Sequence, residues 1–272
     1  AGIVIKDMKK EYPNGFVAIE GMNLDIPDKE FVVLVGPSGC AKSTTLKMIA
    51  GLEEISAGEM YIGDRLVNDV APKDREIAMV FQDPMTSLNP LYTIQDQMEE
   101  VMKLHEDMTA ELRKNRCIEL LEEVGISRPE TRLKNYPHQF SGGMRQRVII
   151  AIALASRPKL LIADEPTTAL DVTIQSQILN LMKRLVKEHR TALMLITHDL
   201  AVVSEMTDKI MVMYCGRIVE KGTRDAIIKR CRHPYTFGLL GSIPKLGSRQ
   251  RRLLQIRGMV PNIMDLPTGC AF

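Results

Sequence analysis

The chain has 272 residues, 45% of them hydrophobic and 26% charged, which allows a sizeable core in one large domain with an insert or a tail. Its 36 Lys and Arg residues nearly balance 34 Asp and Glu residues, so the net charge of +2 gives no electrostatic reason to expect a nucleic acid partner. The apolar runs fall short of the roughly 18 residues that a membrane-spanning helix needs, so a function at a membrane requires another chain to span it.

The cysteines and the first residues indicate the compartment. The cysteines are odd in number, scattered and without a CxxC pair, which favours reduced thiols in the cytoplasm over a disulfide framework. The first residues lack a signal-peptide pattern. The five cysteines are Cys40, Cys117, Cys215, Cys231 and Cys270.

The pattern of residues 3–51 predicts strands followed by a helix. Residues 3–5, 23–26 and 31–35 are predicted strands, and the last is a continuous apolar run typical of the middle of a sheet. That strand runs directly into a glycine-rich segment. Residues 45–50 then have helical spacing and stop at Gly51, so the order is strand, glycine-rich loop, helix.

The middle of the chain changes character and then returns to sheet. Residues 83–140 are polar and amphipathic, with helices predicted at residues 94–104 and 109–125, which indicates an inserted α-helical subdomain. Residues 160–163 and 192–196 are predicted strands, and an apolar helix is predicted from residue 147 to 156. A further helix between the two strands has one apolar stripe of Ile174, Ile178, Leu181 and Leu185. This alternation predicts a parallel α/β core.

The segment after the apolar strand matches the phosphate-binding pattern GxxxxGK[ST], except that Ala41 replaces the last glycine. In such a loop the backbone N–H groups surround a β-phosphate, Lys42 contacts the β and γ oxygens, and the Ser43 hydroxyl binds Mg²⁺. The Ala41 methyl crowds this concavity, which predicts weaker nucleotide binding. A glycine turn that only caps a helix is the alternative, and the strand before the loop argues against it. The predicted loop comprises Gly36, Pro37, Ser38, Gly39, Cys40, Ala41, Lys42, Ser43 and Thr44.

Two carboxylates end the predicted strand at residues 160–163. Ligands of parallel sheets gather at the carboxyl edge of the strands, so Asp164 is expected to hold Mg²⁺ and Glu165 to accept a proton from the water that attacks the γ-phosphate. An isolated Asp-Glu pair would more often be a polar strand end or a helix cap. Its occurrence together with the phosphate loop favours the catalytic interpretation.

A third motif lies between these two. Ser141, Gly142 and Gly143 begin a predicted helix and offer bare N–H groups at its positive end, although the same residues could form an ordinary N-cap. The spacing of the three motifs resembles the ABC ATPase family over nearly the whole chain. The resemblance implies a P-loop NTPase core with an N-terminal antiparallel β subdomain. It also implies that this signature motif acts on ATP held by the opposite subunit of a dimer.

The resemblance assigns roles to four more residues. Tyr12 resembles the aromatic residue that stacks on adenine, although a lone edge-strand tyrosine is nearly as good an interpretation. Gln82 resembles the glutamine that contacts Mg²⁺ and the attacking water, and His198 the histidine that contacts the γ-phosphate. Asp171 resembles the aspartate of a loop that crosses the dimer interface, and it is also a plausible helix N-cap. The remaining histidines are interpreted as surface or packing residues; they are His105, His138, His189 and His233.

Within the family the resemblance changes along the chain. Residues 1–82, including the YPNG segment at residues 12–15, resemble ATPases of carbohydrate importers. Residues 83–272 resemble ATPases of dipeptide, oligopeptide and nickel importers, on the segments DPMTSLNP (83–90), FSGGMRQR (140–147), DEPTTALD (164–171) and HPYT (233–236). The resemblance implies an ATPase subunit of a peptide importer on the cytoplasmic face of a membrane. The alternatives are a carbohydrate importer ATPase and a mosaic or engineered chain in which Ala41 impairs nucleotide binding.

This resemblance also implies domains and partners. Residues 1–82 and 157–232 are expected to form the ATP-binding core, residues 83–156 the helical subdomain, and residues 233–272 a truncated C-terminal extension. The expected partners are a second ATPase subunit, identical or different, membrane-spanning permease subunits and, indirectly, a solute-binding protein. ATP and Mg²⁺ are the expected ligands. An iron–sulfur cluster is not expected, because a cluster needs about four thiolates and Cys270 stands alone in the tail.

Overall fold

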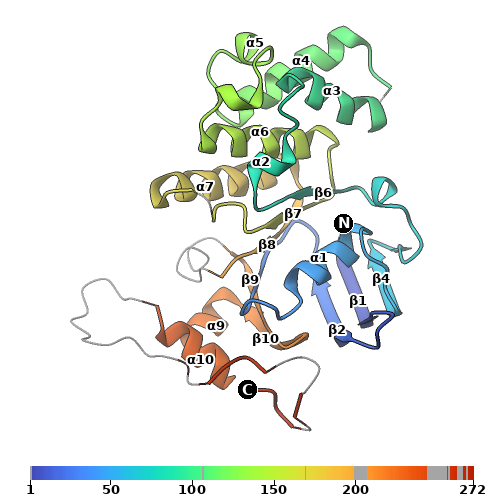
Figure 1. The fold of residues 1–272 in the computed structure, drawn as a ribbon, viewed down its shortest axis with the longest axis vertical. Coiled ribbons are helices and arrows are strands. Elements are labelled where there is room, and N and C mark those ends of the chain that lie inside the picture. The colour runs from blue at the N-terminus through green and yellow to red at the C-terminus, as the bar shows by residue number, and fades with distance from the viewer. Residues whose placement is uncertain are drawn as a thin grey trace, which may run out of the picture. The chain divides into compact units, whose positions relative to one another are not determined.

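The computed structural model describes residues 2–105, 107–168, 170–198, 207–243, 256, 258–261, 266–267 and 269–272. The chain divides into two compact units (Figure 1). Unit 1 comprises Ala1–Arg75 and Met194–Phe272, and unit 2 comprises Glu76–Leu193. The domain bounds expected from the sequence follow the family resemblance and stay a prediction. In the described part of the chain, no helix is both long enough and apolar enough to cross a bilayer.

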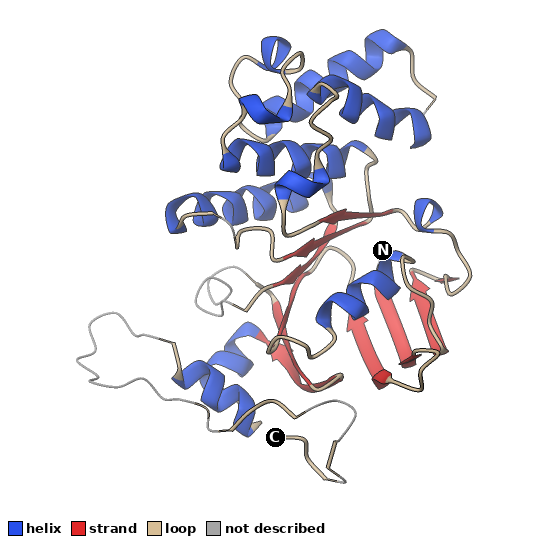
Figure 2. Cartoon of the chain, in the orientation of Figure 1, coloured by secondary structure: helices blue, strands red, loops and turns tan. Residues whose placement is uncertain are grey.

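Unit 1 contains an antiparallel sheet of four strands in the order β2-β1-β4-β5 (Figure 2). The strands are β1 (Ile3–Glu11), β2 (Val17–Ile26), β4 (Ala57–Ile62) and β5 (Arg65–Leu66). The strands predicted at residues 3–5 and 23–26 are therefore parts of longer ones. The register of β1 against β2 shifts between Ile5 and Met8, where Asp7 has a φ of 46°. This irregularity interrupts the two-residue hydrophobic period, which is why the sequence showed only the ends of these strands.

The other strands of unit 1 are neighbours in the order β10-β9-β3. Strand β3 (Phe31–Val35) pairs in parallel with β9 (Lys209–Tyr214), and β9 forms an antiparallel hairpin with β10 (Arg217–Thr223). All five residues of β3 are buried, as the continuous apolar run predicts. The remaining elements of unit 1 are α1 (Lys42–Ala50), η1 (Pro72–Asp74), α9 (Arg224–Arg230) and α10 (Pro234–Gly241). Strand β8 (Ala192–Ile196) has residues in both units.

Unit 2 combines two parallel strands, β6 (Ile77–Val80) and β7 (Leu160–Asp164), with helices. In Figure 1, α3 and α4 lie on α6, and α6 lies on α7. The helices predicted at residues 94–104 and 109–125 are present, and Thr109 caps the second by accepting the N–H of Leu112. Helix α6 begins at Gly142 with Ser141 as its N-cap, as expected of a helix start at these residues, and it continues through the apolar stretch predicted from residue 147. The helices are α2 (Pro84–Ser87), α3 (Ile94–His105), α4 (Ala110–Glu123), α5 (Pro129–Arg132), η2 (Pro137–Gln139), α6 (Gly142–Ala155) and α7 (Val172–His189).

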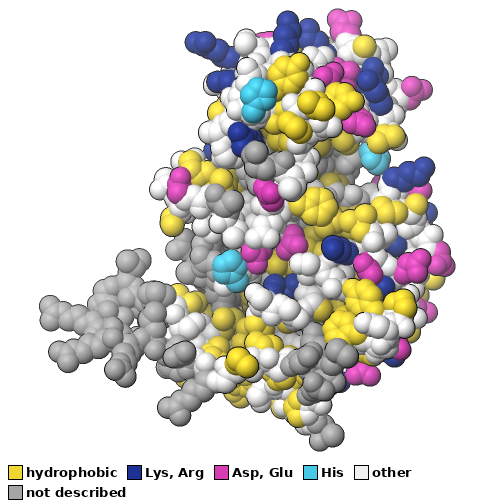
Figure 3. Space-filling model, viewed as in Figure 1, with side chains coloured by type: hydrophobic (Ala, Val, Ile, Leu, Met, Phe, Trp, Pro, Cys, Tyr) yellow, Lys and Arg dark blue, Asp and Glu magenta, His cyan; other side chains and the backbone are white. Residues whose placement is uncertain are grey.

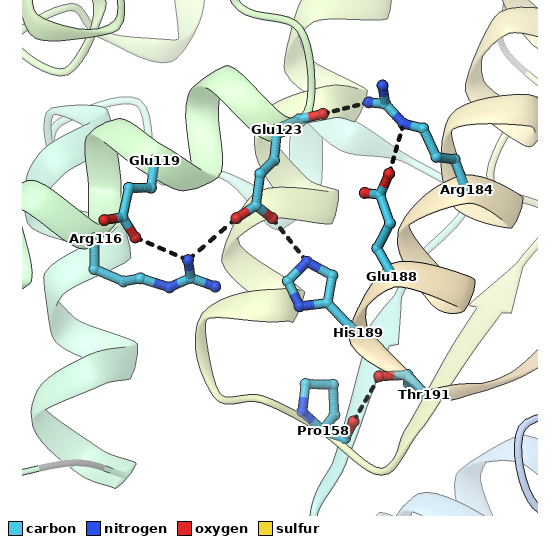
Figure 4. A network of polar contacts seen from close by, with 8 residues as sticks. All are labelled: Arg116, Glu119, Glu123, Pro158, Arg184, Glu188, His189 and Thr191. Carbon is cyan, nitrogen blue, oxygen red and sulfur yellow. Dashed lines mark hydrogen bonds and ion pairs between the residues drawn. The ribbon is translucent and has the colours of Figure 1, made fainter.

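Polar contacts join the C-terminal ends of α4 and α7 (Figure 4). The Glu123 carboxylate accepts a hydrogen bond from Arg116 Nη1 at 3.1 Å and lies 2.7 Å from His189 Nε2. Arg184 donates to the Glu123 carbonyl oxygen at 2.6 Å. His189, interpreted from sequence as a surface or packing residue, is thus part of a network of polar contacts in unit 2.

Arg75 closes the C-terminal end of α1. Its guanidinium donates to the carbonyl oxygens of Met48 and Ile49 at 2.9 and 3.0 Å, and to those of Asn68 and Val70. Arg75 is only 4% exposed. A cation at this position stabilises the negative end of the helix and satisfies carbonyls that have no intrahelical partner.

We expect Arg75→Ala to lower the free energy of unfolding by about 3 kcal/mol, because it removes charged donors and leaves buried carbonyl oxygens unpaired. Urea unfolding followed by circular dichroism measures the change. Arg65→Ala is the matched control, since exposed Arg65 donates one long bond of 3.3 Å to Asp74, and its loss should cost below about 0.5 kcal/mol. Equal effects of the two substitutions would contradict this role of Arg75.

Candidate nucleotide-binding and catalytic site

The glycine-rich loop joins β3 to α1 and lies against the end of β9. A Cβ on Gly36 would come within 2.4 Å of the Met213 carbonyl oxygen, so only glycine allows this approach of the two backbones. Lys42 is buried, and its ammonium donates to the carbonyl oxygens of Gly36 at 2.9 Å and Pro37 at 2.8 Å. The loop therefore curls around a cationic group at the N-terminus of a helix, which is the arrangement that attracts phosphate.

Ala41 occupies the position that precedes α1, with a φ of 72° and a ψ of 23°. This left-handed conformation suits glycine, whereas an L-residue with a Cβ is strained in it. The sequence predicted that the Ala41 methyl crowds the loop. The structure adds a second cost, because alanine holds a backbone conformation that glycine adopts freely.

Two other predicted residues lie in the same unit as the loop. His198 is exposed and follows β8 by two residues. Tyr12 follows β1, and its ring stacks on Phe16 with a centroid distance of 5.9 Å and an interplanar angle of 13°. The Lys10 ammonium also lies 5.0 Å from the centroid of the Tyr12 ring. These contacts orient the Tyr12 ring, and its stacking on adenine stays a prediction.

In unit 2, a polar cluster lies at the carboxyl end of β7. The Glu165 carboxylate accepts hydrogen bonds from the Gln82 amide at 3.3 Å and from the Thr168 hydroxyl at 3.0 Å. Glu165 has a φ of 45°, which is unusual for a residue with a side chain and marks a position held in place by its surroundings. Gln82 and Glu165, 83 positions apart in sequence, are thus brought together, while the roles expected of them stay predictions. Thr168 was not singled out as a partner of Glu165, although a hydroxyl three residues after the carboxylate could have indicated it.

The signature residues begin α6. The Ser141 hydroxyl accepts the backbone N–H of Met144 at 3.4 Å, so Ser141 is a helix N-cap. A Cβ on Gly143 would lie 2.8 Å from Ile174 Cγ2, so Gly143 is needed for packing against α7. Asp171 caps α7 by accepting the N–H of Ile174 at 3.0 Å, which confirms the N-cap interpretation. Its role at a dimer interface stays a prediction.

The candidate residues thus fall into two groups. Unit 1 carries Tyr12, the glycine-rich loop and His198, and unit 2 carries Gln82, Asp164, Glu165, the signature residues and Asp171. Asp164 is the last residue of β7 and is half-buried. Within unit 2 the structure groups Gln82, Glu165 and Thr168, while the roles assigned to the individual residues stay predictions.

A buried parallel strand that leads through a glycine-rich loop into a helix starting with Lys42 and Ser43 defines a P-loop nucleotide-binding protein. Residues 19–168 match the family model described as ABC transporter, and the chain belongs to this family of ATPases. Residues 219–272 match the model described as oligopeptide/dipeptide transporter, C-terminal region. The fold class and the ATPase activity predicted from the sequence are thereby confirmed.

Relatives in sequence also are transport ATP-binding proteins. The chain is 49% identical to the oligopeptide transport ATP-binding protein AppD of Bacillus subtilis, over 94% of this chain and 81% of that protein. It is 46% identical to the dipeptide transport ATP-binding protein DppD of Escherichia coli, over 94% and 81% of the two chains. These relatives confirm the peptide-type resemblance. The separate resemblance of residues 1–82 to carbohydrate importers stays a prediction.

Among solved structures, the dimeric post-hydrolysis ATP-binding cassette MJ0796 bound to ADP and Pi matches with a TM-score of 0.71 and 32% identity. The match covers 82% of this chain and 98% of that one. The cassette cbiO1 from Clostridium perfringens, described as part of the transporter complex cbiONQ, matches with a TM-score of 0.76 and 26% identity over 84% and 90% of the two chains. Both cassettes support the ABC ATPase fold.

We expect Ala41→Gly to raise the free energy of unfolding by about 0.5–1 kcal/mol, because relief of the left-handed strain outweighs the added freedom of glycine in the unfolded chain. For a chain of this size, the midpoint of thermal unfolding should rise by about 2 °C. Ala226→Gly in the exposed face of α9 is the control, and it should lower stability by up to about 1 kcal/mol. A loss of stability in both variants would refute the strain at Ala41.

Proposed function

We propose that this chain is the ATP-hydrolysing subunit of an ABC importer for peptides, working on the cytoplasmic face of a membrane. The observation that carries the catalytic part is the Glu165 carboxylate, held in an unusual backbone conformation and oriented by Gln82 and Thr168. The peptide part is supported by the match of residues 219–272 and by the names of the relatives. In such an importer, ATP hydrolysis by this chain would drive the movement of separate membrane subunits that carry the peptide.

Binding of ATP would begin at the glycine-rich loop. Its backbone N–H groups and the N-terminus of α1 would hold the phosphates, and the Lys42 ammonium, which here donates to Gly36 and Pro37, would contact phosphate oxygens. Tyr12 would stack on adenine, and His198 would contact the γ-phosphate. The methyl group of Ala41 crowds the loop, and its left-handed backbone is strained, so Ala41 should weaken ATP binding.

Hydrolysis would use Glu165 as the group that accepts the proton of the attacking water. The donor set proposed for Mg²⁺ is the Ser43 hydroxyl, the Gln82 amide oxygen and the Asp164 carboxylate. All three donors are oxygens, which fits the preference of this hard cation, and bound Mg²⁺ neutralises charge on the phosphates. Gln82 would both orient Glu165 and report the state of the nucleotide to the helical part of unit 2.

A second ATPase subunit would complete the site. The N-terminus of α6, with Ser141, Gly142 and Gly143, would face ATP held by the loop of the opposite subunit, and Asp171 would lie at the interface. The dimeric state of the cassette MJ0796 supports this proposal, and the partner here is either a second copy or a related ATPase.

The membrane-spanning permease would dock on the helical part of unit 2. A groove of about 640 Å³ lies there, lined in part by Tyr92, Gln97 and Leu104. Leu104 is 75% exposed, and Leu91, in the segment before α3, is 81% exposed. Figure 3 shows hydrophobic side chains at the surface of this helical part, at the top of the view. A solute-binding protein would deliver the peptide to the permease.

The catalytic proposal is tested with purified protein, MgATP, and the variants Glu165→Gln and Lys42→Ala. Glu165→Gln should bind ATP with a Kd within threefold of the native value and lose at least about 100-fold in phosphate release, because only the base is removed. Lys42→Ala should lose most of its ATP affinity. Wild-type rates in Glu165→Gln would disprove the assignment of the base.

The docking proposal is tested with Leu104→Asp, which replaces an exposed apolar side chain of the groove by a charge. We expect at least a tenfold loss of co-purification with peptide-type permease subunits, while ATP hydrolysis by the isolated chain stays within twofold. Lys103→Asp, also on the rim of the groove but polar in the native chain, is the control. Normal assembly of Leu104→Asp would place the permease elsewhere.

A further inference from the structure

An aromatic cluster connects the C-terminal region with the end of β9, all within unit 1. The ring centroid of Tyr214 lies 4.7 Å from that of Tyr235 and 5.7 Å from that of Phe272. Tyr235 and Phe272 are 5.6 Å apart, and the two Phe272 contacts have edge-to-face geometry, which is attractive between aromatic rings. Tyr214 and Tyr235 are buried. The three rings therefore pack as one group.

Helix α10, which carries Tyr235, is fixed on β10. The Glu220 carboxylate accepts the backbone N–H groups of Arg232 at 2.6 Å and His233 at 3.2 Å. His233 Nδ1 in turn accepts the N–H of Tyr235 at 3.2 Å and caps the helix. The HPYT segment noted in the sequence thus sets the direction from which Tyr235 reaches Tyr214.

Directly after Tyr214 comes the two-residue turn of Cys215 and Gly216. Both residues have positive φ values, 44° and 74°, as in the turns that suit the twist of a tight antiparallel hairpin. Glycine adopts this conformation freely, but cysteine does so under strain, and strain persists only where the surroundings hold it. Cys215 is buried, so packing around it supplies that restraint.

The turn contacts the glycine-rich loop by backbone atoms. Gly216 N–H donates to the Cys40 carbonyl oxygen at 3.2 Å. On its other side, a Cβ on Gly216 would lie 2.4 Å from the Ala18 carbonyl oxygen. Since no side chain separates these backbones, a shift of the turn passes directly to Cys40. Burial raises the pKa values of the Cys40 and Cys215 thiols, so both stay neutral in this contact.

We propose that Tyr235 and Phe272 are positioning residues for the nucleotide-binding loop. They hold Tyr214, Tyr214 holds the strained turn of Cys215 and Gly216, and this turn fixes Cys40 within the loop. The inference rests on the proposed binding of ATP by this loop. It assigns to the C-terminal region the role of holding the loop in the conformation that binds ATP. Neither residue needs to touch ATP, because their effect is on the conformation that binds it.

The test compares Tyr235→Ala and Phe272→Ala with the native chain. Removal of either ring should raise the Kd and the KM for MgATP about five-fold, while kcat at saturating ATP stays within twofold, because Glu165 lies in unit 2. Tyr235→Phe keeps the ring and should restore native affinity. Phe237→Ala is the matched control, since Phe237 lies in the same helix α10 but is 64% exposed.

A reciprocal measurement uses the thiol of Cys270, which is exposed and two residues from Phe272. Coupling between two sites acts in both directions, so saturating ATP should slow the alkylation of Cys270 several-fold in the native chain and have no effect in Tyr235→Ala. Mass spectrometry of the native chain assigns the signal to Cys270.

Each outcome decides between the proposals. Folded Tyr235→Ala and Phe272→Ala with native Kd values would overturn the positioning role and leave the proposed function intact. Failure of the folded native chain itself to bind ATP would overturn both. If Tyr235→Ala does not fold, the Kd of Phe272→Ala and the protection of Cys270 in the native chain decide the matter.

Discussion

The nucleotide loop depends on the close approach of two backbones at the ends of β3 and β9. The parallel register that pairs Val35 with Val212 brings Gly36 directly against the Met213 carbonyl oxygen. Any side chain at residue 36 would separate the strands where the loop begins. The loop that leads to Lys42 starts from this contact. Buried apolar side chains along β3 stabilise the strand that supports it.

The helix that follows the loop is held at its far end as well. Gly51 ends α1 in a left-handed conformation, and a Cβ there would lie 2.5 Å from Arg75 Nε. Arg75 can therefore reach the last carbonyl oxygens of the helix. With Ala41 strained at one end and Arg75 bonded at the other, α1 has a fixed length and direction. The phosphate-binding end of the helix is thus set by packing on both sides.

The sequence predicted those features that depend on local pattern and on motifs. The all-buried β3, the helices α3 and α4 and the Asp171 cap followed from periodicity and capping residues. Features that depend on contacts between segments far apart in the sequence could not be predicted from it. The left-handed φ of Cys215 and the bonds of Arg75 to α1 involve residues whose neighbours in sequence carry no corresponding signal. The irregularity near Asp7 likewise hid most of β1.

The contact between Gly143 and Ile174 restricts how the signature region can vary. The start of α6 packs on the first turn of α7 with no room for a methyl group at residue 143. A larger residue at this position requires the Ile174 side chain to move or to be replaced by a smaller one. Substitutions at the two positions should therefore have coupled effects on stability. The Asp171 carboxylate accepts the N–H of Ile174, so the loop before α7 is also fixed to this residue.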